Sequence, residues 1–75
     1  MFKPTKTDLI LVAQSITDLT SHNFYINEAY GRYQLTKQYR DTTGTVSISP
    51  YGTKAETFAF CTAFLAGYHF AKGEN

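Results

Sequence analysis

The C-terminal segment from Thr53 to Gly73 is the feature that most limits what this chain can fold into. Thr53 and Glu56 have the spacing of a capping box, in which two side chains satisfy the free backbone N–H groups at a helix start. Gly73 follows Lys72, an arrangement typical of a helix C-terminus. Between Glu56 and Lys72 the segment has no Asp, Glu, Lys or Arg. The sequence therefore predicts a helix that is apolar around much of its circumference, and one sheet cannot cover such a helix.

This helix has two rows of side chains at 3.6 residues per turn. The larger side chains form a stripe of Phe58, Cys61, Leu65 and Tyr68, which Phe60, Phe64 and Ala71 extend around the helix. The small side chains form a row at four-residue spacing, Ala59, Ala63, Gly67 and Ala71. Because small residues allow close helix approach, two occupants of this row are compatible with the sequence. One is the first helix of the same chain, and the other is a second copy or a different partner.

A shorter helix is predicted near the N-terminus. Thr5 can cap it, and Asp8 lies where the positive end of the helix dipole favours a carboxylate. Apolar residues then recur at helical spacing: Leu9, Val12, Ala13, Ile16 and Leu19. The helix is expected from about Lys6 to about Leu19, with Gln14, Thr17 and Asp18 on the solvent side.

Three strands are predicted between the helices. Two runs with alternating apolar residues flank the sequence EAYG, which indicates a hairpin with Gly31 at a positive-φ turn position. A second turn is expected at Arg40–Gly44, and a third strand at residues 45–49, ended by Pro50. The expected fold is α+β with the order α-β-β-β-α, two helices packed on one face of a three-stranded antiparallel sheet. A chain of 75 residues has room for a single domain, residues 1–75.

The sheet face away from the helices is predicted to be polar. If the apolar positions of the strands face the helices, the other positions are Tyr25, Asn27, Arg32, Gln34, Thr36, Gln38, Arg40, Thr45, Ser47 and Ser49. Two interpretations are open: the solvated side of an antiparallel sheet, or a polar docking face. The candidate docking residues are Tyr25, Arg32, Gln34, Gln38 and Arg40. The face lacks the aromatic ladder of sheet-type RNA binders, since Tyr25 alone is expected to project there.

Motifs for catalysis, metal or cofactors are absent from the sequence. The two histidines, His22 and His69, have no further ligand at a characteristic metal-binding spacing, and no phosphate loop or nucleophile elbow occurs. The single cysteine, Cys61, excludes an internal disulfide and is expected to be buried and inert. A net charge of +1 predicts no general attraction to polyanions or membranes. We expect a cytoplasmic protein that is not an enzyme and that holds no cofactor or metal.

Two resemblances to known families bear on function. The element order and the sequence GTKAETFAFCTAF resemble the double-stranded-RNA-binding domain. In that family several lysines at this helix start grip phosphates, but only Lys54 matches here, because Ala55 and Thr57 occupy other expected positions. The family's Gly-Pro-x-His loop is also absent. The hairpin sequence GRYQL and the strand-to-helix sequence ISPYGTKAE, in a single small domain, resemble short uncharacterised proteins of phages and mobile elements of Gram-positive bacteria. This resemblance implies an accessory or regulatory role.

These observations lead to two hypotheses of function. The first is a small, non-enzymatic interaction protein that contacts a protein partner or forms a homodimer, without binding a membrane. Its interface is expected on the last helix at Phe60, Ala63, Phe64, Gly67 and Ala71. The second, disfavoured hypothesis is a weak double-stranded-RNA-binding-like module that contacts nucleic acid through Lys54.

Overall fold

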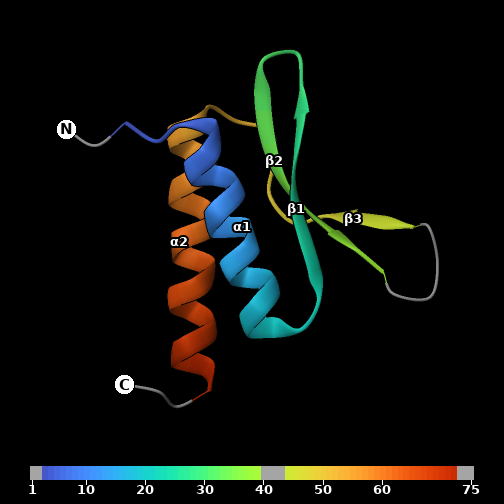
Figure 1. Cartoon of the computed structure of the whole chain (residues 1–75), viewed down its shortest axis with the longest axis vertical. Helices are drawn as coiled ribbons and strands as arrows, with labels where there is room; N and C mark the ends of the chain where they lie inside the picture. Colours follow the sequence, from blue (N-terminus) through green and yellow to red (C-terminus); the bar gives the residue numbers. More distant parts are fainter. Residues whose placement is uncertain (1–2, 40–43, 73–75) are drawn as a thin grey trace.

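The computed structural model describes residues 3–39 and 44–72. The elements are α1 (Lys6–Thr20), β1 (Asn23–Ala29), β2 (Arg32–Gln38), β3 (Thr45–Ser47) and α2 (Lys54–Ala71). The antiparallel sheet has the order β1-β2-β3, and both helices lie on one side of it (Figure 1). The predicted α-β-β-β-α fold is therefore confirmed. Arg40 and most of the predicted second turn, residues 40–43, lie outside the described residues.

Both helices begin with the capping box. In α2, the Thr53 hydroxyl accepts the Glu56 N–H at 3.1 Å, and Glu56 Oε1 accepts the Thr53 N–H at 2.8 Å. Thr5 and Asp8 make the same pair of hydrogen bonds at the start of α1. The two helices run in the same direction, so both N-termini lie at the end of the molecule that carries the β1–β2 turn (Figure 1).

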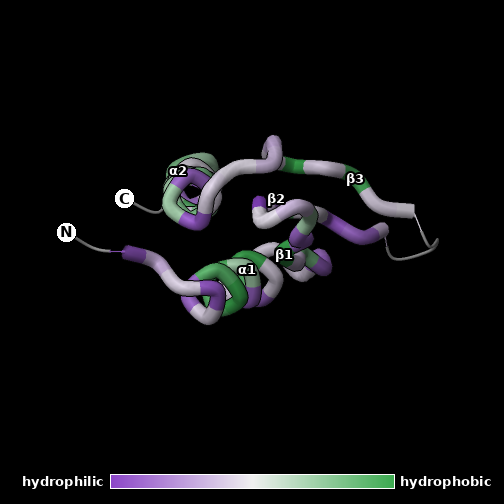
Figure 2. Tube along the Cα trace, turned by 90° about the horizontal axis from the view of Figure 1, so that it is seen from above, coloured by the Kyte–Doolittle hydropathy of each residue, from purple (hydrophilic) through white to green (hydrophobic). Residues whose placement is uncertain are grey.

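The core lies between the two helices and the inner face of the sheet. Its buried members are Val12, Ala13, Ile16, Phe24, Leu35 and Cys61. The Phe24 ring of β1 packs against the Phe64 ring of α2 with 5.5 Å between centroids. Cys61 is completely buried, and this burial raises the pKa of its thiol to about 11. Viewed from above, α1 lies at the β1 end of the sheet, whereas α2 lies on the β3 side (Figure 2).

The β1–β2 hairpin closes with a two-residue turn. Gly31 has a φ of 72°, as predicted, but Tyr30 also has a positive φ of 56°. Positive values at both positions identify a type I′ turn, where asparagine normally precedes glycine. The Tyr30 side chain is fully exposed, so no packing contact explains its backbone conformation.

The third strand is shorter than predicted, because the side chain of Ser49 takes the place of a backbone hydrogen bond to β2. β3 ends at Ser47. The Ser49 hydroxyl accepts the Leu35 N–H at 2.9 Å, and the Leu35 carbonyl accepts the N–H groups of Ile48 and Ser49. Ser49 is consequently buried rather than on the solvated outer face, which corrects the sequence-based expectation. Pairing with β2 resumes at Gly52, which exchanges two hydrogen bonds with Tyr33 at 2.8 and 2.9 Å.

Candidate protein-binding surfaces

The row of small residues on α2 is not covered by α1. Ala59, Ala63, Gly67 and Ala71 are all exposed. A Cβ atom built on Gly67 would have no atom of a neighbouring element within 4 Å. The buried residues of α2, Thr57 and Cys61, lie on another side of the helix. The interpretation that α1 occupies this row is therefore wrong, because α2 turns its larger side chains toward α1 and the sheet.

An exposed apolar surface results, which we call the α2 outer face and define as Ala59, Ala63, Ala66, Gly67 and Phe70. Phe70 is 78% exposed although it is a large apolar side chain. It follows Cys61 by nine residues, which is two and a half turns of helix and places it on the opposite side. This spacing could have identified Phe70 from the sequence, but the large apolar residues around the helix obscured it.

The five residues predicted for an interface divide into two groups. Ala63, Gly67 and Ala71 are exposed. Phe60 and Phe64 are half-buried and pack against the core, so only part of each ring is available to a partner. The exposed side of α2 is thus centred farther from Phe64 and closer to Phe70 than the predicted interface.

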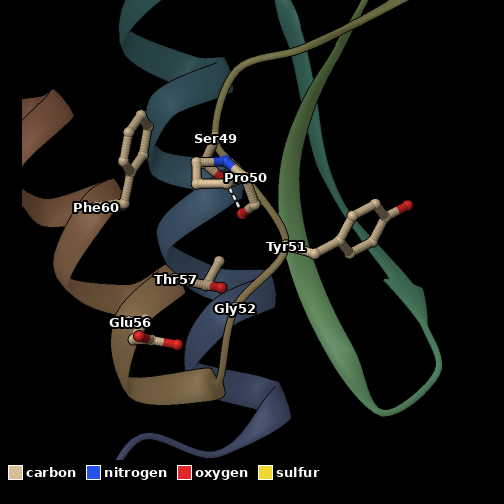
Figure 3. Close-up of a pocket in the computed structure, with 7 residues that line it drawn as sticks. All are labelled: Ser49, Pro50, Tyr51, Gly52, Glu56, Thr57 and Phe60. Carbon is tan, nitrogen blue, oxygen red and sulfur yellow. Dashed lines mark hydrogen bonds between the residues drawn. The ribbon is translucent and has the colours of Figure 1, made fainter.

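A small cavity adjoins this surface at the N-terminal end of α2. It has a volume of about 120 Å³ and lies between α2 and residues 49–52, with Pro50 and Phe60 among its walls (Figure 3). Its polar side chains have partners: Thr57 Oγ1 donates to the Tyr33 carbonyl at 3.0 Å, and Glu56 accepts the Thr53 N–H. The hydrogen bonds from Thr53 lower the pKa of Glu56. The cavity therefore offers apolar walls to a small side chain, and its carboxylate is used for capping.

The predicted polar sheet face does not form an open docking site. Gln34 and Thr36, expected to be solvated, are only 7% and 3% exposed, and Thr36 Oγ1 donates to Gln34 Oε1 at 3.0 Å. Both lie on the central strand of the sheet. Gln38 accepts a hydrogen bond from Asn23 at 3.1 Å, whereas Tyr25 and Arg32 are exposed.

Tyr51 is a second aromatic residue on that face, in addition to Tyr25, and it was not predicted from the sequence. Its ring points away from the helices (Figure 3), and its hydroxyl accepts a hydrogen bond from Asn27 of β1 at 2.9 Å. No strand pattern includes Tyr51, because it lies in the segment between β3 and α2. The polar groups of this face thus largely satisfy one another.

Lys54, the candidate nucleic-acid contact, is exposed at the start of α2. It lines a broad hollow together with Lys3, Pro4 and Gly31. Lys6 is engaged elsewhere, because its ammonium group lies 2.7 Å from the Glu28 carboxylate. Among the residues that the structure describes, Lys3 and Lys54 are the cations that line this hollow.

Groups that could bind a metal do not converge within residues 3–39 and 44–72: no three His, Cys, Asp or Glu side chains lie close enough to hold an ion. The helices of the described residues are also too short or too polar to cross a lipid bilayer. No protein-family model, curated protein or solved structure matches this chain. The two resemblances noted from the sequence accordingly stay predictions.

Proposed function

We propose that the protein is a small binding protein without catalytic activity, which associates with a second copy of itself through the α2 outer face. The observation that carries this proposal is that the small-residue row and Phe70 are exposed on one side of α2. Exposed apolar patches on small domains commonly mark interaction sites. Such an interface suits an accessory or regulatory protein that acts by contact.

Self-association is favoured by the composition of this surface. The helix has no charged side chain between Glu56 and Lys72, so two copies can meet without removing an ion from water. Ala63 and Gly67 allow the two helix backbones to approach closely. Full burial of a phenylalanine side chain contributes about 1.5–3 kcal/mol, and a two-fold axis doubles every such contact.

An antiparallel crossing gives this dimer a specific geometry. If Ala63 of one copy lies opposite Gly67 of the other, Phe70 lies opposite Phe60 of the other copy, beside the cavity that Phe60 and Pro50 help to line. An apolar cavity of about 150 Å³ can hold benzene, so the cavity of about 120 Å³ can receive part of a phenyl ring. The two-fold axis then forms this contact twice.

Sedimentation velocity at increasing protein concentration tests the proposal. The wild-type chain is expected to shift from monomer toward dimer, whereas Ala63→Arg stays monomeric and folded because Ala63 is exposed. Ser15→Arg, on the exposed side of α1, is the matched control and is expected to dimerise like wild type. A wild-type protein that is folded and monomeric at the highest concentration would refute the homodimer.

A second candidate function is weak binding of duplex RNA, favoured by the position of Lys3 and Lys54 on one hollow. Phosphate contacts by lysine release counterions, so such binding weakens as salt increases. A gel shift with duplex RNA at low salt, comparing wild type with Lys54→Ala, tests it. Binding that the substitution abolishes would support this candidate, whereas equal shifts or none would exclude Lys54 as the contact.

A further inference from the structure

The outer edge of β1 has backbone groups that point away from the sheet. Tyr33 of β2 exchanges two backbone hydrogen bonds with Gly52. Leu35 of β2 accepts the N–H groups of Ile48 and Ser49 and donates its own N–H to the Ser49 hydroxyl, so both residues direct their backbone groups toward the segment that follows β3. Their partners across the β1–β2 pair are Glu28 and Ile26. In an antiparallel pair, opposite residues direct their N–H and C=O groups either toward each other or both outward. Ile26 and Glu28 therefore direct both groups toward the free edge.

Only one position of this edge is closed by a side chain of α1. The Thr17 hydroxyl accepts the Phe24 N–H at 2.9 Å and donates to the Phe24 carbonyl at 3.1 Å. Thr17 was expected on the solvent side, but it satisfies both outward groups of Phe24. In the part of the chain that the structure describes, the outward backbone groups of Ile26 and Glu28 have no such partner. Native proteins usually block or cover edges of this kind.

A groove lies beside this edge, between α1 and β1. It has a volume of about 270 Å³ and is lined by Ile10, Ala13 and Gln14 of α1 and by residues 23–26 of β1. Ile10 forms an apolar wall that is 53% exposed. The groove thus begins next to the backbone groups of Ile26, and a side chain held there would contact Ile10.

We propose that β1 accepts an extended peptide of another protein as a fourth, antiparallel strand. One peptide residue pairs with Ile26, and the residue two positions earlier pairs with Glu28, so both outward groups of each receive partners. Paired side chains share a face of the sheet, so the residue opposite Ile26 directs an apolar side chain into the groove. The residue opposite Glu28 lies beside the exposed Lys6–Glu28 ion pair and is polar.

A second copy of this chain fits the edge less well than a single peptide. α1 borders the edge: Thr17 bonds to Phe24 near one end, and Lys6 pairs with Glu28 near the other. It lies at the β1 end of the sheet (Figure 2). If β1 of one copy paired with β1 of a second copy about a two-fold axis, both α1 helices would lie at the same strand–strand interface and crowd each other. One extended segment fills the edge without adding a helix there.

A peptide selected from a random library on the full chain is the probe, and its affinity for variants is the readout. Glu28→Pro removes the outward N–H, and proline is tolerated on an edge strand when that N–H faces outward. It is expected to weaken binding about tenfold, equivalent to about 1.4 kcal/mol. Glu28→Ala removes the same ion pair but keeps the N–H, and is expected to bind like wild type. Equal affinity of both variants would overturn the proposal, as would a selection that yields no binder.

A second pair of variants leaves the backbone of β1 untouched. Ile10→Glu places a charge in the groove and is expected to weaken peptide binding about tenfold. Leu11→Glu, at a neighbouring position that is 60% exposed and does not line the groove, is expected to have no effect. Both sites are exposed, so both variants should fold. Unchanged binding by Ile10→Glu, or equal loss in both, would refute peptide binding at this edge.

Discussion

The substitution Gly67→Ala distinguishes an open helix face from one that is packed inside the monomer. Gly67 lies within the 18-residue helix α2, and its φ is not in the positive range that favours glycine. Apart from the helix's own backbone and the two residues next to Gly67 in the chain, no atom lies within 4 Å of the position that a Cβ would take. A methyl group at this site therefore meets no neighbour, and only the helix propensity changes.

Alanine is favoured over glycine in a helix interior by about 1 kcal/mol, because glycine loses more backbone entropy on folding. We therefore expect Gly67→Ala to raise the free energy of unfolding by about 1 kcal/mol. In a domain of this size that corresponds to a rise in Tm of about 4–8 °C. Urea and thermal unfolding of dilute protein, where self-association is minimal, measure the change.

The same substitution at Gly52 serves as the control. A Cβ on Gly52 would lie 3.0 Å from Glu56 Oε1 and 3.1 Å from Glu56 Cβ, so Gly52→Ala crowds the side chain that caps α2 and requires it to shift by a few tenths of an ångström. Complete loss of a helix cap costs about 1 kcal/mol, so Gly52→Ala, which strains this cap, is expected to destabilise the protein by up to about that amount. If Gly67→Ala also lowered the stability of the dilute protein, the α2 outer face would be packed in the monomer, and the reasoning would be refuted.

Tyr30→Asn is expected to stabilise the protein by about 1 kcal/mol in urea unfolding, because asparagine tolerates positive φ better than a bulky residue; Tyr30→Phe, which keeps the strain, should change nothing. Thr17→Val is expected to lower the free energy of unfolding by about 1–3 kcal/mol, because it leaves both Phe24 backbone groups unpaired. Thr17→Ser keeps the hydroxyl and should retain most of the stability. Equal losses of stability in the two variants would contradict the role of the Thr17 hydroxyl. Cys61 is expected to react with a thiol reagent only after unfolding. Burial raises the pKa of the Cys61 thiol from 9.0 to about 11. The contribution of the buried, protonated thiol to the free energy of unfolding is therefore fully present below pH 9 and is lost as the pH rises toward 11. A rapid reaction of the folded protein with the thiol reagent at neutral pH would contradict the burial of Cys61.

Local signals were sufficient to predict the elements and their order. The two Thr-x-x-acid sequences predict helix starts because the hydrogen bonds of a capping box form within four consecutive residues. Alternation around EAYG predicts the hairpin because side chains of a strand alternate between two faces. Element order and chain length then leave few ways to bury both apolar helices, and packing them on one sheet face is the arrangement observed.

Other features depended on contacts between segments far apart in the sequence. The conformation of Ser49 follows from its bond to Leu35, and the burial of Gln34 follows from its place on the central strand. The helical pattern places Thr17 on the solvent side, and only the packing of α1 beside the edge of β1 gives its hydroxyl a partner. The positive φ of Tyr30 follows from the two-residue turn that the strand register imposes.

The rotation of α2 about its own axis is the feature that depended most on tertiary structure. The sequence by itself determined that α2 is a long, capped helix without charge between Glu56 and Lys72. It did not determine which side faces the core, because apolar residues occur around most of the circumference and periodicity selects no single face. The rotation was decided by which side chains fit against α1 and the sheet, with Cys61 and Phe64 turned inward. That choice left Ala63, Gly67 and Phe70 exposed, and with them the surface that we propose binds a partner.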